Sequence, residues 1–189
     1  MNATSISTTR TTASSPGAAY ELLRAAIHDG NPVLFHEHKA LYGRKGPVRR
    51  GAVAEVGKAA VLRQGSDVTI VASLLMVERA LAAAETLAAG GISAEVIDLR
   101  WVRPLDMDTI SASVAKTGRL VIAEEQWHEG GWGSAIISQL AQAGTPWKAA
   151  PIAVSLPYDM LIPYSPPLED AILPSPERIA EAAHTAVGR

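Results

Sequence analysis

Three short clusters in the sequence contain residue types that could perform chemistry. The first is His36-Glu37-His38. Residues i and i+2 of a strand share a face, so the two histidines could together bind a metal ion such as zinc. The spacing of the sequence assigns no third ligand to this pair. We therefore favour the alternative, which is the polar end of a strand.

The second cluster is Glu124-Glu125, directly after the apolar residues 120–123. Adjacent residues of a strand point to opposite faces, which argues against an acid–base couple of the two carboxylates. Ligands of α/β proteins usually bind where parallel strands have their carboxyl ends. A ligand-facing or interface role for either glutamate therefore stays open.

The third cluster is the glycine-rich stretch 130–133, which contains Trp132 and follows His128. Glycines before a helix could expose amides to a phosphate, but the P-loop and dinucleotide patterns are absent, so we expect them to allow close packing on the sheet. His128 could act as a base, yet no serine or acid is spaced to assist it. We predict that His128 and Trp132 belong to a subunit interface, with core burial as the alternative for the tryptophan.

Composition limits the classes of protein to which the chain can belong. Its 189 residues suit one domain with an appendage, and 48% hydrophobic residues suffice for a core. A net charge of −2 gives no reason to expect nucleic acid or an anionic membrane as partner. No apolar run approaches the roughly 20 residues of a membrane span. The absence of cysteine excludes disulfides and thiolate metal sites, and it suits a cytoplasmic location.

The beginning of the chain differs in pattern from the rest. Residues 1–14 are rich in serine and threonine, and we predict a disordered start. Ser15 and Pro16 predict the N-cap and first residue of a helix that ends at residues 29–32. A short strand at 33–35 and an exposed linker at 42–51 follow. We place the domain boundary between residues 50 and 51.

Beyond the boundary, strands and helices alternate. The turn at residues 64–67 predicts an antiparallel pair between the strands that flank it. The later alternation predicts right-handed crossovers and a mostly parallel sheet in a three-layer α/β/α domain. The strands are predicted near 58–63 and at 68–72, 94–99, 120–123 and 152–155, and the helices at 76–89, 104–116, 134–143 and from 176 onward.

The sequence as a whole resembles the beta subunit of the decarboxylating component of 2-oxo acid dehydrogenases, of the pyruvate, branched-chain and acetoin types. The stretch 98–117 is also similar to transketolase and deoxyxylulose-phosphate synthase, which share this terminal domain. The matching segments are AAIHDGNPVLFHEHKALYG, GKAAVLRQGSDVTIVA, AEVIDLRWVRPLDMDTISASVAKTGRLVIAEE, GGWGSAI and PYSPPLEDAILPSPERI.

This resemblance implies a five-stranded, mostly parallel sheet with an antiparallel first strand. Residues 51–189 would form the transketolase C-terminal-like domain, and 15–50 a remnant of the preceding pyrimidine-binding domain with its linker. The family's thiamine-contacting glutamate and active-site histidine match no residue here, so no catalytic or cofactor-binding residue is assigned. Thiamine diphosphate and magnesium would be bound mostly outside this chain, which looks truncated and inactive by itself.

The resemblance also implies a function, partners and an ion site. The intact protein would perform oxidative decarboxylation of a 2-oxo acid with acyl transfer to lipoyl. Its partners would be the alpha subunit, the dihydrolipoyl acyltransferase core and a second beta subunit. In some members a potassium ion binds at positions matching Ala26, Ile27, Asp29 and Asn31, although Asp-Gly-Asn-Pro also ends a helix without an ion. The alternatives are a non-catalytic interaction module and a transketolase-type terminal domain. A flavodoxin-like nucleotide binder is a third, but this sequence lacks the phosphate loop that such a protein has after its first long strand.

Overall fold

The apolar runs of the sequence form the strands of a five-stranded sheet. The computed structural model describes residues 8–157 and 159–188. The strand order is β3-β5-β4-β7-β8, and every neighbouring pair is parallel except β3 with β5. The predicted α/β class with one antiparallel first strand is therefore confirmed. The strands are β3 (Ala60–Arg63), β4 (Val68–Ala72), β5 (Ala94–Asp98), β7 (Leu120–Trp127) and β8 (Ile152–Leu156).

The predicted pairing of the first two strands is wrong, because β3 pairs with β5 and not with β4. The turn between β3 and β4 passes over the start of β5. There the backbone N–H of Gly65 donates to the Glu95 carboxylate at 3.2 Å, and a Cβ at Gly65 would overlap the backbone of Ala94. The turn therefore does not close a hairpin, and β5 lies between the two strands.

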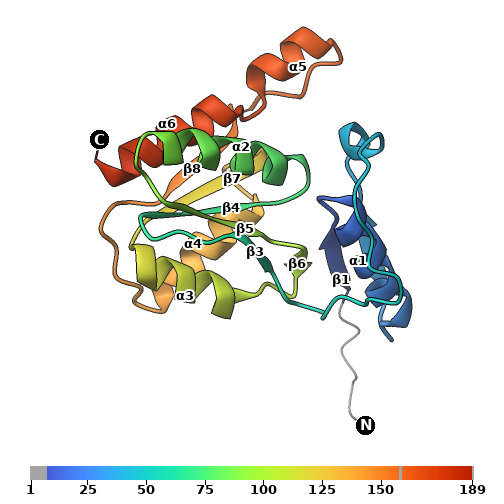
Figure 1. Cartoon of the computed structure of the whole chain (residues 1–189). Coiled ribbons are helices and arrows are strands. Elements are labelled where there is room, and N and C mark those ends of the chain that lie inside the picture. Colours follow the sequence, from blue (N-terminus) through green and yellow to red (C-terminus); the bar gives the residue numbers. More distant parts are fainter. Residues whose placement is uncertain (1–7, 158, 189) are drawn as a thin grey trace.

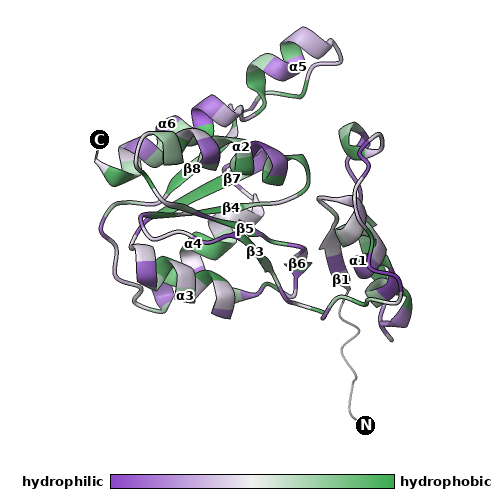
Figure 2. Cartoon of the chain, in the orientation of Figure 1, coloured by the Kyte–Doolittle hydropathy of each residue, from purple (hydrophilic) through white to green (hydrophobic). Residues whose placement is uncertain are grey.

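Helices cover both faces of this sheet (Figure 1). On one face α2 (Leu75–Ala89) and α6 (Pro176–Val187) pack together, and on the other lie α3 (Met107–Thr117) and α4 (Trp132–Gln142). Because both faces are covered, every residue of β4 and β5 is buried. Figure 2 shows the result as hydrophobic strands between helices of mixed character. The three predicted layers are present.

A smaller N-terminal unit lies beside this domain (Figure 1). It consists of β1 (Thr9–Thr12), α1 (Pro16–His28), β2 (Val33–His36) and the 3₁₀ turn η1 (Lys39–Leu41). Strand β6 (Trp101–Arg103), from the larger domain, joins it in a sheet of order β2-β1-β6. The N-terminal unit is thus connected to the larger domain through a shared sheet.

The prediction of a disordered start is wrong for residues 9–12, which form β1; residues 1–7 lie outside the described part of the chain. Tertiary contacts order this segment. The Thr11 hydroxyl donates to the Arg100 carbonyl at 2.8 Å, and the fully buried Trp101 packs in a cluster with Leu22 of α1. Local composition alone could not reveal these partners, which lie about half the chain away.

Two further features concern the helices. Ser15 caps α1 as predicted, since its hydroxyl accepts from the Ala18 N–H at 3.2 Å. A short helix that was not predicted, α5 (Pro166–Ile172), forms within the proline-rich segment. In Figure 1 it extends away from the body of the domain.

Candidate functional site at the carboxyl edge of the sheet

Four polar residues gather where the parallel strands have their carboxyl ends. Asp98 is the last residue of β5, Ser73 follows β4, and Glu124 and Glu125 lie in β7. The N-terminal unit provides hydrogen-bond partners to two of these acids. The edge therefore combines the place where α/β proteins usually bind ligands with the contact between the two parts of the chain.

Asp98 is the most deeply buried of the residues that meet the N-terminal unit here, with 1% of its surface exposed. Its carboxylate accepts from the Ser14 hydroxyl and from the Arg100 N–H, the latter at 3.1 Å. Burial disfavours the charged form and raises the pKa of Asp98 to about 6. A carboxyl group with this pKa can exchange a proton just below neutral pH.

We expect Asp98→Asn to change how stability depends on pH. Because the folded pKa is raised, the contribution of Asp98 is most favourable at low pH and is lost as pH rises from about 4 to about 6. Relative to the Asp98→Asn variant, the wild type should lose at most about 3 kcal/mol over this range, since one pKa unit is about 1.4 kcal/mol. Urea unfolding of both proteins between pH 4 and pH 7 measures the difference.

Comparing the wild type with Asp98→Asn cancels the contribution of other acids, whose effect on stability changes with pH in the opposite direction. Glu95 and Asp106 have lowered pKa values, because hydrogen bonds and neighbouring lysines outweigh the burial that acts to raise them. Their contributions are lost as pH falls, equally in both proteins. Parallel pH profiles of wild type and variant would show that the Asp98 charge is not penalised by the fold.

Glu124 is fully buried beneath the glycine-rich turn. The N–H of Gly133 donates to its Oε2 at 3.1 Å, and burial raises the pKa of Glu124 in spite of this bond. A Cβ at Gly131 would lie 2.5 Å from Oε2, and one at Gly133 would lie 2.5 Å from the Ile122 side chain. Close packing on the sheet, predicted for the glycines, is confirmed. A phosphate is disfavoured here because it would meet the carboxylate.

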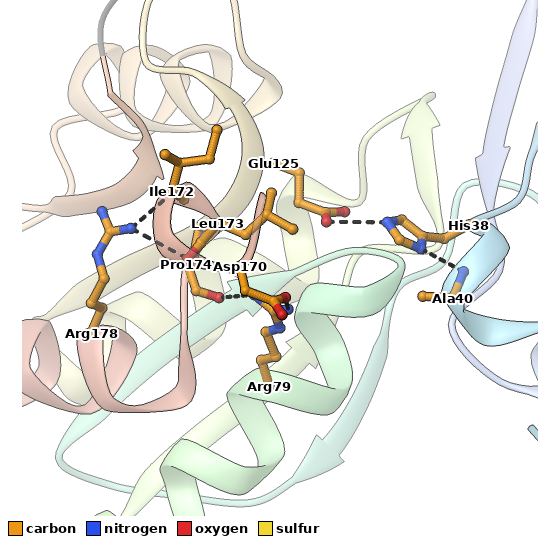
Figure 3. Close-up of polar contacts among 9 residues, drawn as sticks. All are labelled: His38, Ala40, Arg79, Glu125, Asp170, Ile172, Leu173, Pro174 and Arg178. Carbon is orange, nitrogen blue, oxygen red and sulfur yellow. Dashed lines mark hydrogen bonds and ion pairs between the residues drawn. The ribbon is translucent and has the colours of Figure 1, made fainter. Parts of the chain in front are cut away.

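Glu125 points to the opposite side of β7, as the alternation of the strand predicts, and pairs with His38 (Figure 3). The distance from His38 Nε2 to Glu125 Oε1 is 3.1 Å. His38 Nδ1 accepts from the Ala40 N–H at 3.2 Å, so the neutral ring carries its hydrogen on Nε2 and donates it to Glu125. Burial raises the pKa of Glu125, and His38 opposes that effect.

The metal hypothesis for His36 and His38 gains no support from this geometry. His36 is the exposed end of β2, while His38 is engaged by Glu125 and Ala40. Among the residues that the structure describes, no three histidine, cysteine or acidic side chains are grouped so that they could hold a metal ion. The polar strand end stays our interpretation of this cluster.

The predicted potassium site lies at the end of α1. Asp29 Oδ1 accepts from both the backbone and side-chain nitrogens of Asn31 at 3.0 Å, and Asp29 Oδ2 accepts from the Thr9 hydroxyl at 2.9 Å. These bonds, that from the Asn31 backbone first, lower the pKa of Asp29. They also explain the turn without an ion. Potassium binding at Ala26, Ile27, Asp29 and Asn31 stays a prediction.

The two predicted interface residues have different environments. His128 is exposed, and its carbonyl accepts from the Ser134 hydroxyl, so the ring can reach a partner. Trp132 is only 7% exposed and packs with Ile136 and Leu140 in the core between the sheet and its helices. This favours the core alternative for Trp132, because a buried ring offers little surface to another subunit. The interface role of His128 stays a prediction.

Two contacts that join the units, Ser14 with Asp98 and His38 with Glu125, were not predicted from the sequence. One signal was available: an aspartate at the end of a strand that is buried on both faces is an acid in need of a partner. Nothing in the sequence pointed to Ser14 as that partner.

The fold and this edge define the class of protein. A three-layer domain whose parallel sheet has one antiparallel edge strand is the transketolase C-terminal type, and the model of the family "Transketolase, C-terminal domain" matches residues 57–179. A solved structure titled "Split gene transketolase, inactive beta4 tetramer" superposes with a TM-score of 0.77 at 25% identity, covering 96% of this chain and 57% of that one. The chain belongs to the transketolase C-terminal domain family.

Its curated relatives are beta subunits of oxidoreductases. It is 47% identical over 172 residues to the acetoin:2,6-dichlorophenolindophenol oxidoreductase subunit beta of Cupriavidus necator, covering 89% of this chain and 51% of that protein. It is 43% identical over 173 residues to the mitochondrial pyruvate dehydrogenase E1 component subunit beta-1 of Arabidopsis thaliana, covering 89% and 48%. The chain thus spans about half the length of these relatives. In the described residues no helix has the length and apolarity to cross a membrane.

Proposed function

We propose that this chain serves as the terminal-domain part of the beta subunit of a 2-oxo acid dehydrogenase. The observation that carries the proposal is the 47% identity to an acetoin oxidoreductase beta subunit over 172 residues. Oxidative decarboxylation and acyl transfer to lipoyl would belong to the assembled protein. The proposed partners are the alpha subunit, the dihydrolipoyl acyltransferase core and a second beta subunit. The cytoplasm stays our prediction for its location, although the plant relatives are named mitochondrial.

We propose that the residues described by the structure do not form a thiamine diphosphate site. A diphosphate with its metal needs free amides or cationic groups and oxygen ligands for the ion. The glycine-rich turn is filled by the Glu124 carboxylate, and the described residues contain no grouping of three acidic or histidine side chains. We therefore propose that the cofactor and magnesium are held elsewhere in the assembly, and we assign no catalytic step to this chain.

An exposed apolar surface supports a role in association. The segment between β8 and α6 exposes several large side chains, of which Leu161 is 82% and Leu168 58% exposed. Trp127 anchors the start of this segment, since its Nε1 donates to the Met160 carbonyl at 2.8 Å. Exposed apolar surface of this kind marks protein contacts. We define the association surface as Met160, Leu161, Ile162, Tyr164 and Leu168.

We expect the chain to self-associate at high micromolar concentration, because these side chains leave water when two copies meet. Leu161→Ser combined with Leu168→Ser should weaken association at least about tenfold, which corresponds to about 1.4 kcal/mol. Sedimentation equilibrium measures the constants. Ile27→Ser, at a 72% exposed position on α1, is the matched control and should leave association unchanged.

Two results would contradict the proposal. A wild-type chain that is monomeric at these concentrations would remove the association role. Thiamine-dependent turnover of pyruvate, a branched 2-oxo acid or acetoin by this chain alone would show that it contains catalytic groups. A non-catalytic interaction module is the rival function, and it predicts association without any turnover when the remaining subunits of such a dehydrogenase are added.

A further inference from the structure

A cavity of about 250 Å³ lies at the carboxyl ends of β4 and β7, the two strands at the centre of the sheet. After β4 the chain enters α2 on one face, and after β7 it enters α4 on the other. Neighbouring strands whose connections diverge in this way leave a crevice between them, and α/β proteins bind ligands in that crevice. The N-terminal unit covers one side of the cavity through His38.

The cavity has apolar walls and a few convergent polar groups, which is typical of small-molecule sites. Trp132, Ile162 and Leu173 form apolar walls, and Ser73 and Glu125 supply the polar groups at the strand ends. The volume limits an occupant to a small organic molecule.

Charges around the cavity are not balanced. Glu125 and Glu169 line it, and Asp170 lies nearby on α5. Two guanidiniums lie near them (Figure 3). Arg79 donates to the Pro174 carbonyl at 2.7 Å and lies 3.9 Å from Asp170, and Arg178 donates to the carbonyls of Ile172 and Leu173 at 3.0 and 3.4 Å. These three carboxylates still outnumber the two guanidiniums, both of which donate to backbone carbonyls beside the cavity.

The two lining carboxylates differ in their partners. Glu125 has His38, whose Nε2–H it accepts, and its side chain is 15% exposed. Within residues 8–157 and 159–188, no hydrogen bond or ion pair reaches the Glu169 carboxylate. A ligand with a positive charge would therefore be attracted to the carboxylates of Glu125 and Glu169, whereas these carboxylates would repel a carboxylate or phosphate ligand.

We propose that this cavity binds a small primary ammonium compound with a short apolar chain. The ammonium group lies between Glu125 and Glu169 and donates hydrogen bonds to both, and the apolar chain contacts Trp132 and Ile162. The Ser73 hydroxyl is available for a third hydrogen bond. The site is formed by residues of this chain alone, so its test does not require the other subunits of a dehydrogenase.

The test is a comparison of three molecules of the same shape, titrated into the full chain at neutral pH. The probes are 3-methylbutylammonium, 3-methylbutan-1-ol and 3-methylbutanoate, and the readout is the amide spectrum in ¹H–¹⁵N NMR. We expect saturable shifts of the amides of Ser73, Leu74, Glu125 and Gln126 with the ammonium compound only. Equal shifts with the alcohol, or none that saturate with the ammonium compound, would overturn the proposal.

Variants separate the charge from the shape of the cavity. Glu125→Gln and Glu169→Gln should each weaken binding of 3-methylbutylammonium about tenfold or more, as expected when one charged contact is lost. Glu85→Gln makes the same charge change at an exposed position of α2 and should retain wild-type affinity. Because Glu169 lies at the surface, its variant remains informative if Glu125→Gln fails to fold. Unchanged affinity in Glu169→Gln would contradict the assigned contacts.

Discussion

Trp132→Ala is expected to lower the free energy of unfolding by about 3–5 kcal/mol, the usual cost of removing a large aromatic side chain from a core. Trp132 is 7% exposed and packs among buried residues that include Ile122 and Ile136. Urea unfolding followed by circular dichroism measures the change.

The control for this variant is Trp147→Ala, because Trp147 contacts the same core cluster but is only partly buried. It should cost clearly less stability. The opposite pattern, in which Trp132→Ala keeps full stability but loses self-association, would return Trp132 to the interface role that the sequence suggested.

Gly133→Ala is the second change for which we expect a large loss of stability. The new Cβ would lie 2.5 Å from the Ile122 side chain and 2.8 Å from Glu124 Oε1. Overpacking of a core costs about 1–3 kcal/mol. Displacing Gly133 also breaks the hydrogen bond from its N–H to the buried Glu124 carboxylate, and leaving a buried charged group unsatisfied costs about the same again or more.

The measurement is the midpoint of thermal or urea unfolding, compared with Gly43→Ala. A Cβ at Gly43 meets nothing within 4 Å, and its backbone does not require glycine, so this control should unfold like the wild type. If Gly133→Ala also unfolds like the wild type, then the turn can move away from the sheet and the Glu124 contact is not a constraint on the fold.

Both variants lie beside the edge where the N-terminal unit meets the larger domain. Buried acids of that edge pair with residues of the unit, Asp98 with Ser14 and Glu125 with His38. The unit therefore closes one side of the central cavity and shields the strand ends from water.

Local pattern accounts for the elements that were predicted correctly. A helix start depends on neighbours in the sequence, and Ser15 with Pro16 set the first turn of α1 at the predicted residue. The alternation of a strand is equally local, so the separation of Glu124 from Glu125 onto opposite faces followed from adjacency alone. The order of strands and helices in the larger domain follows from the same kind of signal.

Pairing between distant segments is where prediction from the sequence failed. The turn after β3 indicated a hairpin with β4, but the neighbour of β3 in the sheet is β5. The crossover through α2 places β5 between β3 and β4, and no local signal in the turn indicates this. Residues 9–12 had the composition of a disordered segment, yet they pair with β2 on one side and with β6 on the other. The composition of a segment indicates how much apolar surface it can bury by itself. It does not indicate whether a distant segment will pair with it.

The sequence by itself determined the α/β alternation, the helix caps and the resemblance to dehydrogenase beta subunits, because each depends on residue type and on spacing within a short window. Only the tertiary structure showed that Trp132 is 7% exposed, that Ser14 lies beside Asp98 across 84 positions of the sequence, and that His38 lies beside Glu125 across 87. The physical reason is that burial and pairing at the sheet edge depend on where the crossovers carry the chain, and no local pattern specifies that position.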